Sequence, residues 1–400
     1  MSWEKVKLID CCVSIADGDH QPPPKSETGI PFVTIANIVN NQFDFTNSMF
    51  VPNYYYEKLD SKRKAQKGDI LYSVVGSFGI PVFIKDNKPF VFQRHIAILR
   101  PNGNIDARFL YYTMLSRDFY MKADAAAIGA AQRTVSLTAL RNIEITVPPI
   151  ETQRRIADIV SAYDDLIENN RKQIKLLEEA AQRLYKEWFV DLRFPGHEHT
   201  KIVDGVPEGW ESCILDDVIE FDPKVRLDKD RVKQCVPMSA LSTSSMVLDM
   251  NEISETTSNS GSKFQNGDTL LARITPCLEN GKTAFVHGIE SDEGAVGSTE
   301  YIVMRSKQLN PYMVYLLSRT NGFRQSAINS MSGSDGRQRV KADKLKSLAY
   351  LRPPIGLVHS FEQKVAPVFG MVFTLNKQVF AATQARDRLV PKLMSGKVEV

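Results

Sequence analysis

The chain is 400 residues long, is 43% hydrophobic and carries a formal net charge of +3 at pH 7. This length and apolar content suffice for two or three independent cores. The near balance of charge excludes a uniformly basic protein. Any binding of nucleic acid therefore requires basic side chains concentrated on one face, or a partner that supplies much of the positive charge.

The cysteines and the apolar segments indicate a cellular compartment. The five cysteines fall at no metal-ligand or disulfide spacing and are typical of ordinary thiols in a reducing compartment. Residues 1–4 open no signal peptide, and we expect no run of the roughly 18 apolar residues that a membrane span needs. The sequence predicts a soluble, cytoplasmic protein with no membrane partner.

The first 148 residues predict a mixed α/β domain. Apolar residues at helical spacing predict a helix over 107–121. Strands are predicted from five short stretches, residues 30–35, 69–75, 89–92, 96–99 and 143–147.

A long amphipathic helix follows, from Glu151 to Phe189, about 57 Å at 1.5 Å per residue. A shorter stripe of this kind usually packs on its own domain, but this one is longer than a domain of about 150 residues can cover. We therefore expect a second long helix to bury it by knobs-into-holes packing. The predicted seam is Ile156, Val160, Ile167, Ile174, Leu177, Leu184 and Trp188.

The remainder of the chain repeats this order. Pro148 and Pro353 each open a Pro-Pro-Ile sequence before a helical pattern, and they are 205 residues apart. The Gly68-Asp69 turn has a counterpart at Gly267-Asp268, and residues 311–317 predict a helix like the one in the first copy. These matches predict a tandem duplication. The seam of the second long helix is predicted to be Phe361, Val365, Val372, Val379, Leu389 and Leu393.

The pattern predicts an α+β protein with two similar mixed α/β domains separated by two long helices. The predicted domains are residues 1–148 and 194–353, and the helices are 149–193 and 354–400. Because one domain lies between the helices along the chain, we expect them to form an antiparallel coiled coil.

Four residues interrupt the helical patterns. Asn170 and Arg386 place polar side chains in the seams, where they can specify the register of the pair. Pro367 and Pro391 each remove a helical hydrogen bond, so we expect a bend near Pro367 and a loosened last turn after Pro391.

Three stretches of this chain resemble the specificity subunits of type I restriction-modification systems. They are Pro-Pro-Ile-Glu-Thr-Gln-Arg-Arg-Ile-Ala at 148–157, Gly-Val-Pro-Glu-Gly-Trp at 205–210 and Arg-Leu-Val-Pro-Lys-Leu-Met-Ser-Gly at 388–396. The resemblance covers the whole chain, in the order domain, helix, domain, helix. The second helix departs from the first, with Gly-Leu-Val-His-Ser at 356–360 in place of Glu-Thr-Gln-Arg-Arg.

The resemblance implies a DNA-binding subunit without catalysis. Each globular part would be a target recognition domain that contacts one half of a split, asymmetric site on double-stranded DNA. The helices would set the spacer and dock two methyltransferase (modification) subunits, which use S-adenosylmethionine to methylate adenine. Motor-nuclease (restriction) subunits would complete the holoenzyme. A spacer helix longer than one 34 Å turn of duplex agrees with half-sites separated by unread base pairs.

The residues themselves offer no catalytic centre. The chain contains no glycine-rich dinucleotide or phosphate loop and no Cys/His cluster at metal spacing. His197 and His199 lie two residues apart in a linker without a third ligand. We expect no catalytic residue, metal or cofactor in this chain.

Base contacts are expected from polar side chains at strand edges and in glycine-rich loops, which can become ordered on DNA. A solvated loop with scattered charges is the alternative for each residue. The predicted DNA-binding residues are Ser73, Arg94, His95, Gln132, Arg133 and Thr134 in the first domain, and Arg273, Thr299, Arg337, Gln338, Arg339 and Lys341 in the second.

Two other functions share these features. The chain could be the separate specificity chain of a restriction enzyme whose nuclease and methyltransferase are fused. It could also be a non-catalytic coiled-coil scaffold that binds proteins through its two globular parts. A gel shift with the cognate methyltransferase separates DNA binding from the scaffold, and the neighbouring genes separate the two restriction systems.

Overall fold

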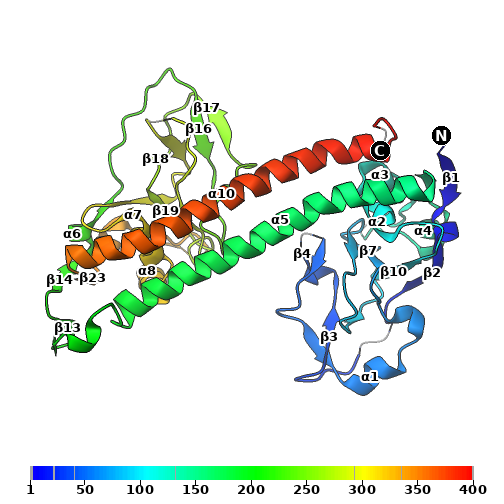
Figure 1. The fold of residues 1–400 in the computed structure, drawn as a ribbon, viewed down its shortest axis with the longest axis horizontal. Coiled ribbons are helices and arrows are strands. Elements are labelled where there is room, and N and C mark those ends of the chain that lie inside the picture. Colours follow the sequence, from blue (N-terminus) through cyan, green and yellow to red (C-terminus); the bar gives the residue numbers. More distant parts are fainter. Residues whose placement is uncertain are drawn as a thin grey trace. The chain divides into compact units, whose positions relative to one another are not determined.

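The computed structural model describes residues 3–20, 23–39, 41–130, 132–291, 293–334 and 336–398. The chain divides into two compact units. Unit 1 is Met1–Asp165 together with Thr383–Val400, and unit 2 is Leu166–Ala382. Both units contain helices and sheets (Figure 1), so the predicted mixed α/β fold is confirmed.

Unit 1 is built on a four-stranded antiparallel sheet. Its central strands read Ile-Ala-Ile-Leu and Ile-Leu-Tyr-Ser and are buried at all of these positions, as expected for strands covered on both faces. The strand order is β2 (Cys12–Asp17), β10 (Ile96–Pro101), β7 (Ile70–Ser73) and β8 (Pro81–Phe83).

Smaller sheets complete unit 1. In one of them β3 (Ile30–Val33) pairs antiparallel with β6 (Met49–Val51) and parallel with β9 (Val91–Phe92). Two further pairs are β1 (Glu4–Lys7) with β11 (Glu144–Val147), and β4 (Ile38–Val39) with β5 (Gln42–Phe43).

The helix predicted over 107–121 is in fact two helices, α2 (Ala107–Leu115) and α3 (Arg117–Ala126). Ser116 has an extended backbone, and its hydroxyl accepts a hydrogen bond of 3.2 Å from the backbone N–H of Phe119. Serine favours this capping geometry over the middle of a helix, and the apolar spacing does not reveal the break. The other short helices of unit 1 are α1 (Asn53–Lys58) and α4 (Leu137–Asn142).

Unit 2 repeats the topology of unit 1. Its four-stranded sheet has the equivalent order β15 (Ile219–Phe221), β22 (Tyr301–Ser306), β19 (Thr269–Ala272) and β20 (Thr283–Phe285). A second sheet has the order β17 (Ser254–Thr256), β16 (Lys233–Val236), β21 (Ala295–Gly297) and β18 (Ser262–Phe264). The β16–β21 pair is parallel, like β3–β9 in unit 1. The repeat seen in the sequence is therefore a repeat of fold.

The other elements of unit 2 also have counterparts. β14 (Glu211–Ile214) pairs with β23 (Ala349–Arg352) as β1 pairs with β11. The helices are α6 (Leu215–Val218), α7 (Pro311–Ser318), α8 (Asn321–Asn329) and α9 (Ala342–Lys346), and a small hairpin joins β12 (Ile202–Val203) to β13 (Val206–Pro207).

An Asp–Arg ion pair lies at the same place in both units. In unit 1 the Arg100 guanidinium donates to both carboxylate oxygens of Asp69, at 3.0 and 2.9 Å. In unit 2 Arg305 donates to both oxygens of Asp268, at 2.7 Å each. Each aspartate is buried and follows a glycine with positive φ, so the repeated Gly-Asp turn binds a neighbouring strand by charge.

The long helices are α5 (Ile150–Tyr185), which continues into a π-helical turn (Lys186–Val190), and α10 (Ile355–Met394). In unit 2, Asn170 of α5 donates to the Gln378 side chain of α10 at 3.0 Å, and the Tyr185 and Phe361 rings are 6.0 Å apart. Asn170 therefore contacts residue 378 and the later Tyr185 contacts the earlier Phe361, so the two helices are antiparallel within this unit.

In unit 1 the two helices are also antiparallel. Leu393 belongs to the same buried cluster as Ile156 and Val160, and Arg386 donates to Asp164 at 2.7 Å. Asp164 also accepts a hydrogen bond of 2.8 Å from the Tyr112 hydroxyl. The polar residue expected at position 386 thus pairs with a carboxylate of α5.

The predicted seam residues avoid solvent. Leu177, Leu184 and Leu389 are half-buried and all the others are buried. α10 continues without interruption through Pro367 and Pro391 to Met394, so neither proline ends it. The helix ends three residues after Pro391, and Leu393 in this last turn belongs to the buried core of unit 1.

The expectation that no segment resembles a membrane span needs correction. By length and composition α10 could cross a membrane. The same test is passed by core helices, and in this structure Phe361, Val365, Phe369 and Val372 of α10 are buried in unit 2. Packing within the fold therefore accounts for part of the apolar character of α10, and 33% of its most apolar window is buried.

The start of each long helix is tied to its unit by an amide. Gln153 of α5 is buried, accepts from the Asp106 backbone N–H at 2.9 Å and donates to the Pro148 carbonyl at 2.8 Å. In unit 2 the amide belongs to the globular part and not to the long helix. The Asn310 side chain, at the start of α7, donates to the Val358 carbonyl of α10 at 3.1 Å. This exchange explains how the second helix can lack the Glu-Thr-Gln-Arg-Arg sequence.

The Asp268–Arg305 pair predicts a large loss of stability on truncation. Asp268 is 1% exposed, and Asp268→Ala leaves the Arg305 guanidinium without its carboxylate. We expect the free energy of unfolding to fall by about 3 kcal/mol, measured by urea denaturation. Asp343→Ala, in an ion pair whose aspartate is 87% exposed, is the matched control and should leave the transition unchanged. Equal effects of the two variants would contradict the assignment.

The Asn170–Gln378 hydrogen bond predicts a coupling that a double-mutant cycle can measure. Asn170 is 3% exposed, whereas Gln378 is exposed. Gln378→Ala should therefore destabilise the protein by about 1 kcal/mol, because it leaves a buried amide unpaired. In an Asn170→Leu background the same change should have no effect on the denaturation midpoint. Equal destabilisation in both backgrounds would show that the hydrogen bond is not the cause.

Candidate nucleic-acid interface

Three segments that carry predicted site residues meet in unit 1. The backbone N–H of Val74 donates to the His95 carbonyl at 2.9 Å, and the N–H of Val135 donates to the Val74 carbonyl at 2.9 Å. The N–H of Gly76 donates to the Arg133 carbonyl at 3.0 Å. We call residues 73–76, 93–95, 128–130 and 132–135 the first junction.

The equivalent segments meet in unit 2 through matching hydrogen bonds. The backbone N–H of Arg273 donates to the Glu300 carbonyl at 3.0 Å, that of Val340 to the Arg273 carbonyl at 2.9 Å, and that of Thr275 to the Gln338 carbonyl at 3.1 Å. We call residues 272–275, 298–300, 332–334 and 336–340 the second junction. Lys341 directly follows it and is exposed.

Each junction includes a tight loop closed by a pair of backbone hydrogen bonds. Ile128 and Thr134 exchange two such bonds in unit 1, and Ser332 and Arg339 do so in unit 2. A Cβ on Gly129 would lie 2.6 Å from the Gln132 carbonyl oxygen, so this turn requires glycine. Ala131 and Asp335, which belong to the loops expected to become ordered on DNA, lie outside the described residues.

The predicted residues of the first junction differ in exposure. Arg94, Gln132 and Arg133 are exposed, and Thr134 is half-buried. Ser73 is a correction, because it is fully buried and its hydroxyl accepts a hydrogen bond of 2.9 Å from the Ile80 N–H. Ser73 therefore stabilises a turn and is not available to a ligand.

His95 is half-buried at the centre of the first junction. Burial lowers the pKa of its imidazole, and the positive charge of Arg94 lowers it further. At neutral pH the ring is therefore uncharged and can donate from one nitrogen and accept at the other.

Arg133 makes contacts within its own unit. Its guanidinium donates to the Asp124 carboxylate, and a second terminal nitrogen donates to the Asp124 carbonyl at 2.5 Å. It lies 5.7 Å from the centroid of the Phe78 ring, which is stacked on Tyr120 at 5.8 Å. The first junction thus contains an arginine already in an ion pair, and the Phe78–Tyr120 stack lies beside it.

The second junction is more polar. Thr299 and Arg337 are exposed, and Gln338 is half-buried. Arg339 forms an ion pair with Glu300 in which its Nε lies 3.0 and 2.9 Å from the two carboxylate oxygens, and its Nη2 lies 2.7 Å from one of them. Sequence patterns place Glu300 in the neighbourhood but do not reveal this contact across 39 residues.

Two buried polar atoms of the second junction lack hydrogen-bond partners among the described residues. They are Nε of Arg273 and the hydroxyl oxygen of Thr275. Burial without a partner is unfavourable, and such atoms are uncommon in folded proteins. Both residues belong to the second junction, where the Arg273 backbone N–H donates to the Glu300 carbonyl and the Thr275 backbone N–H donates to the Gln338 carbonyl.

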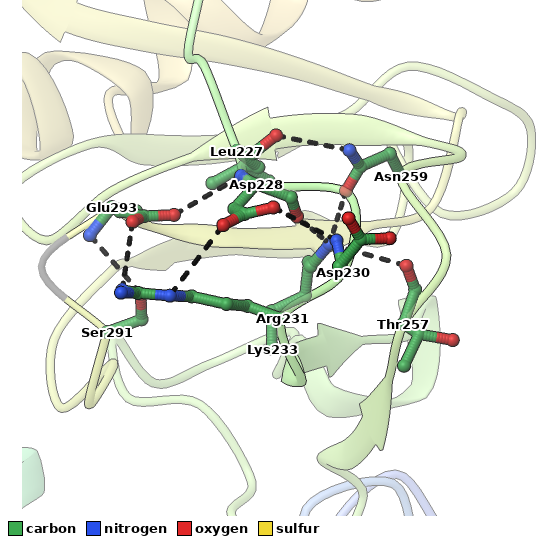
Figure 2. A network of polar contacts seen from close by, with 9 residues as sticks. All are labelled: Leu227, Asp228, Asp230, Arg231, Lys233, Thr257, Asn259, Ser291 and Glu293. Atoms are coloured by element: carbon green, nitrogen blue, oxygen red, sulfur yellow. Dashed lines mark hydrogen bonds and ion pairs between the residues drawn. The ribbon is translucent and has the colours of Figure 1, made fainter.

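A second polar network in unit 2 has a structural explanation. Lys233 is 5% exposed, and its amine donates to the Asp228 and Thr257 carbonyls and to the Asn259 side chain. Figure 2 shows these contacts, with Arg231 bridging Asp228 and Glu293. Because Lys233 uses all three donors on its own unit, the network anchors the loop before β16.

The described residues include no group of three or more metal-ligating side chains. The five cysteines are free thiols. Burial raises the pKa of Cys11 to about 11 and that of Cys12 to about 12, so both remain protonated and weakly nucleophilic at neutral pH.

Comparison with known proteins finds similarity to one family. Residues 2–179 match the family model described as the type I restriction modification DNA specificity domain. The specificity subunit of the MjaIX type I restriction enzyme of Methanocaldococcus jannaschii is 25% identical, with 100% of this chain and 94% of the relative covered. The HindI specificity subunit of Haemophilus influenzae is 20% identical, with 92% and 94% covered.

A solved structure shares the fold. The crystal structure of a type I restriction-modification system S subunit from M. genitalium superposes with a TM-score of 0.62 at 14% identity, covering 98% of this chain and 96% of the other. Sequence and fold agree along nearly the whole chain. This chain is therefore similar along its length to the specificity subunits of type I restriction-modification systems, and the DNA specificity domain of that family is matched over residues 2–179.

Proposed function

We propose that this chain recognises a bipartite DNA site for a type I restriction-modification enzyme, with each junction contacting one half-site. A specificity subunit contributes recognition and no catalysis, so the chemistry belongs to its partners. The observation that carries this proposal is the repeated junction. The same backbone hydrogen bonds hold different side chains in the two units.

The difference between the junctions suits an asymmetric site. DNA sequence is read through hydrogen bonds and apolar contacts to base edges. The first junction offers Arg94, Gln132 and the Phe78–Tyr120 stack, whereas the second offers Arg337 and the Arg339–Glu300 pair. Two such surfaces cannot select the same sequence. The same backbone arrangement with different side chains in each unit therefore favours two half-sites of different sequence.

The long helices are the proposed docking surface for the modification subunits. Although their seam side chains are buried or half-buried, several other apolar side chains remain exposed in unit 2, including Leu176 at 64%. The others are Leu166, Met371 and Phe380. Exposed apolar side chains on a helix are typical of a protein interface. On this proposal S-adenosylmethionine is bound by the modification subunits, motor-nuclease subunits join them, and the complex acts on DNA in the cytoplasm.

We also propose that the helix pair sets the number of unread base pairs. Both α5 and α10 are continuous elements that contribute residues to both units. Each is paired with the other in unit 1 and in unit 2. A helix changes length by a fixed 1.5 Å per residue, so helix length can act as a ruler.

DNA binding through the second junction is tested with Arg337→Ala in the full chain assembled with its modification subunits. Arg337 is exposed, and its loss should weaken binding to the cognate duplex roughly ten-fold in a gel-shift titration. Size-exclusion chromatography should show unchanged assembly. Lys5→Ala, an exposed lysine on β1, is the control and should bind normally. Unchanged affinity of the Arg337 variant in the intact complex would argue against this junction as a DNA surface.

The ruler is tested by deleting residues 166–172 and 376–382 together, one heptad from each helix around the Asn170–Gln378 pair. Seven residues correspond to about 10 Å, or about three base pairs at 3.4 Å each. Mapping methylated adenines in DNA from cells that carry the variant should therefore reveal the same half-sites with a shorter spacer. Asn170→Leu with Gln378→Leu keeps the helix length and should keep the spacer. An active deletion variant with the original spacer would refute the ruler.

A further inference from the structure

We propose that Arg339, positioned by Glu300, recognises a guanine in the half-site contacted by the second junction. This inference rests on the proposed function and names the base and the residues that discriminate it. Arg339 lies on the loop of the second junction and is 39% exposed. The first junction has Thr134 and His95 at the equivalent backbone positions. The Arg339–Glu300 pair is therefore expected to act on one half-site only.

The contacts of Arg339 leave suitable donors free. A guanidinium has five N–H groups. Glu300 accepts from Nε and from Nη2, and the Arg337 carbonyl accepts from Nη1 at 3.1 Å. Among the described residues, one N–H on each terminal nitrogen of Arg339 has no acceptor. Guanine presents two acceptors in the major groove, N7 and O6, which match a pair of guanidinium N–H groups.

The ion pair favours a base edge over a phosphate. Glu300 cancels most of the positive charge of Arg339, and its carboxylate would repel a phosphate that came close. The directed N–H donors remain, and the carboxylate fixes the plane of the guanidinium. A paired arginine is therefore better suited to a neutral acceptor pair than to the DNA backbone.

The neighbouring arginines keep the Glu300 carboxylate charged. The hydrogen bond from Arg339 lowers the pKa of the Glu300 carboxyl, and the charges of Arg339 and Arg273 lower it further. Glu300 thus remains ionised at neutral pH and holds Arg339 in place. The unpartnered Nε of Arg273 and hydroxyl of Thr275 lie in the same junction.

Arg133 of the first junction differs from Arg339 in which of its donors are free. Both of its terminal nitrogens donate to Asp124, to the carboxylate and to the carbonyl. The end of this guanidinium that would meet a guanine is therefore occupied by its own unit. The two arginines occupy similar loops but offer different edges to DNA.

The test uses the full chain assembled with its modification subunits and the duplex that this complex selects from a random pool. Each guanine is replaced in turn by 7-deazaguanine, which lacks N7, or by hypoxanthine, which keeps N7 and O6. One guanine in the half-site of the second junction should be sensitive. There 7-deazaguanine should weaken binding roughly ten-fold or more, and hypoxanthine should not.

Variants then assign this guanine to Arg339. With Arg339→Gln or Arg339→Lys, guanine and 7-deazaguanine at that position should bind equally, because the planar pair of donors is gone. Arg339→Lys keeps the positive charge. A thermal melt with the midpoint of the wild-type protein is the control that this variant is folded. Glu300→Gln should shrink the penalty for 7-deazaguanine without weakening binding to unrelated DNA. Arg231→Lys, in an Arg–Glu pair outside the junction, should keep the full penalty.

Two readouts can overturn the inference. If no guanine in that half-site is sensitive to loss of N7, or if the Arg339 variants keep the full penalty, Arg339 does not read guanine. If Arg339→Gln lowers the slope of log affinity against log salt by about one, Arg339 contacts a phosphate instead. Failure of the proposed function looks different, because the wild-type complex would then select no sequence at all.

Discussion

The structure depends on the burial of two apolar helix seams that lie about 200 residues apart in the chain. Neither globular part has a complete core without both long helices. Leu393, near the end of α10, belongs to the same buried cluster as Ile156 of α5 in unit 1. In unit 2, Phe361 and Phe369 of α10 are buried against aromatic side chains of α5 and α7. The hydrophobic effect therefore joins each unit to both helices, and only the full chain satisfies it.

Polar contacts then give this non-directional packing a register. The buried Asn170 finds its partner at Gln378, and Arg386 finds Asp164. An unpaired amide or charge in either seam is unfavourable, so alternative registers are disfavoured. The same logic operates within each unit, where the Asp69–Arg100 and Asp268–Arg305 pairs fix the central strands. A rigid frame leaves the junction loops free to vary.

The frame of each junction, which is the proposed DNA surface, is built from backbone hydrogen bonds. The hydrogen bonds that join the three segments of each junction do not depend on side-chain identity, so they survive when the side chains change. One junction can carry an aromatic stack beside Arg133, and the other can carry Arg339 held by Glu300. This separation of the shared backbone frame from the variable side chains suits the proposed selection of different sequences by the two units.

Periodic features were predictable from the sequence, because they arise from local geometry. The helical period of the seams, the repeated Gly-Asp turn and the strands at 96–99 and 69–75 all correspond to elements of the structure. Local patterns failed where one side chain chose between competing hydrogen bonds. Ser116 breaks a helix by capping the next one, and Ser73 turns inward to Ile80.

The sequence by itself determined that the chain is duplicated, that it is mixed α/β and that two long amphipathic helices recur. Only the tertiary structure decided which residues share a junction and which donors remain free. Glu300 meets Arg339 because two loops are joined through the Arg273 backbone. Such contacts are set by the packing of the whole unit, and the spacing of residues along the chain carries no trace of them.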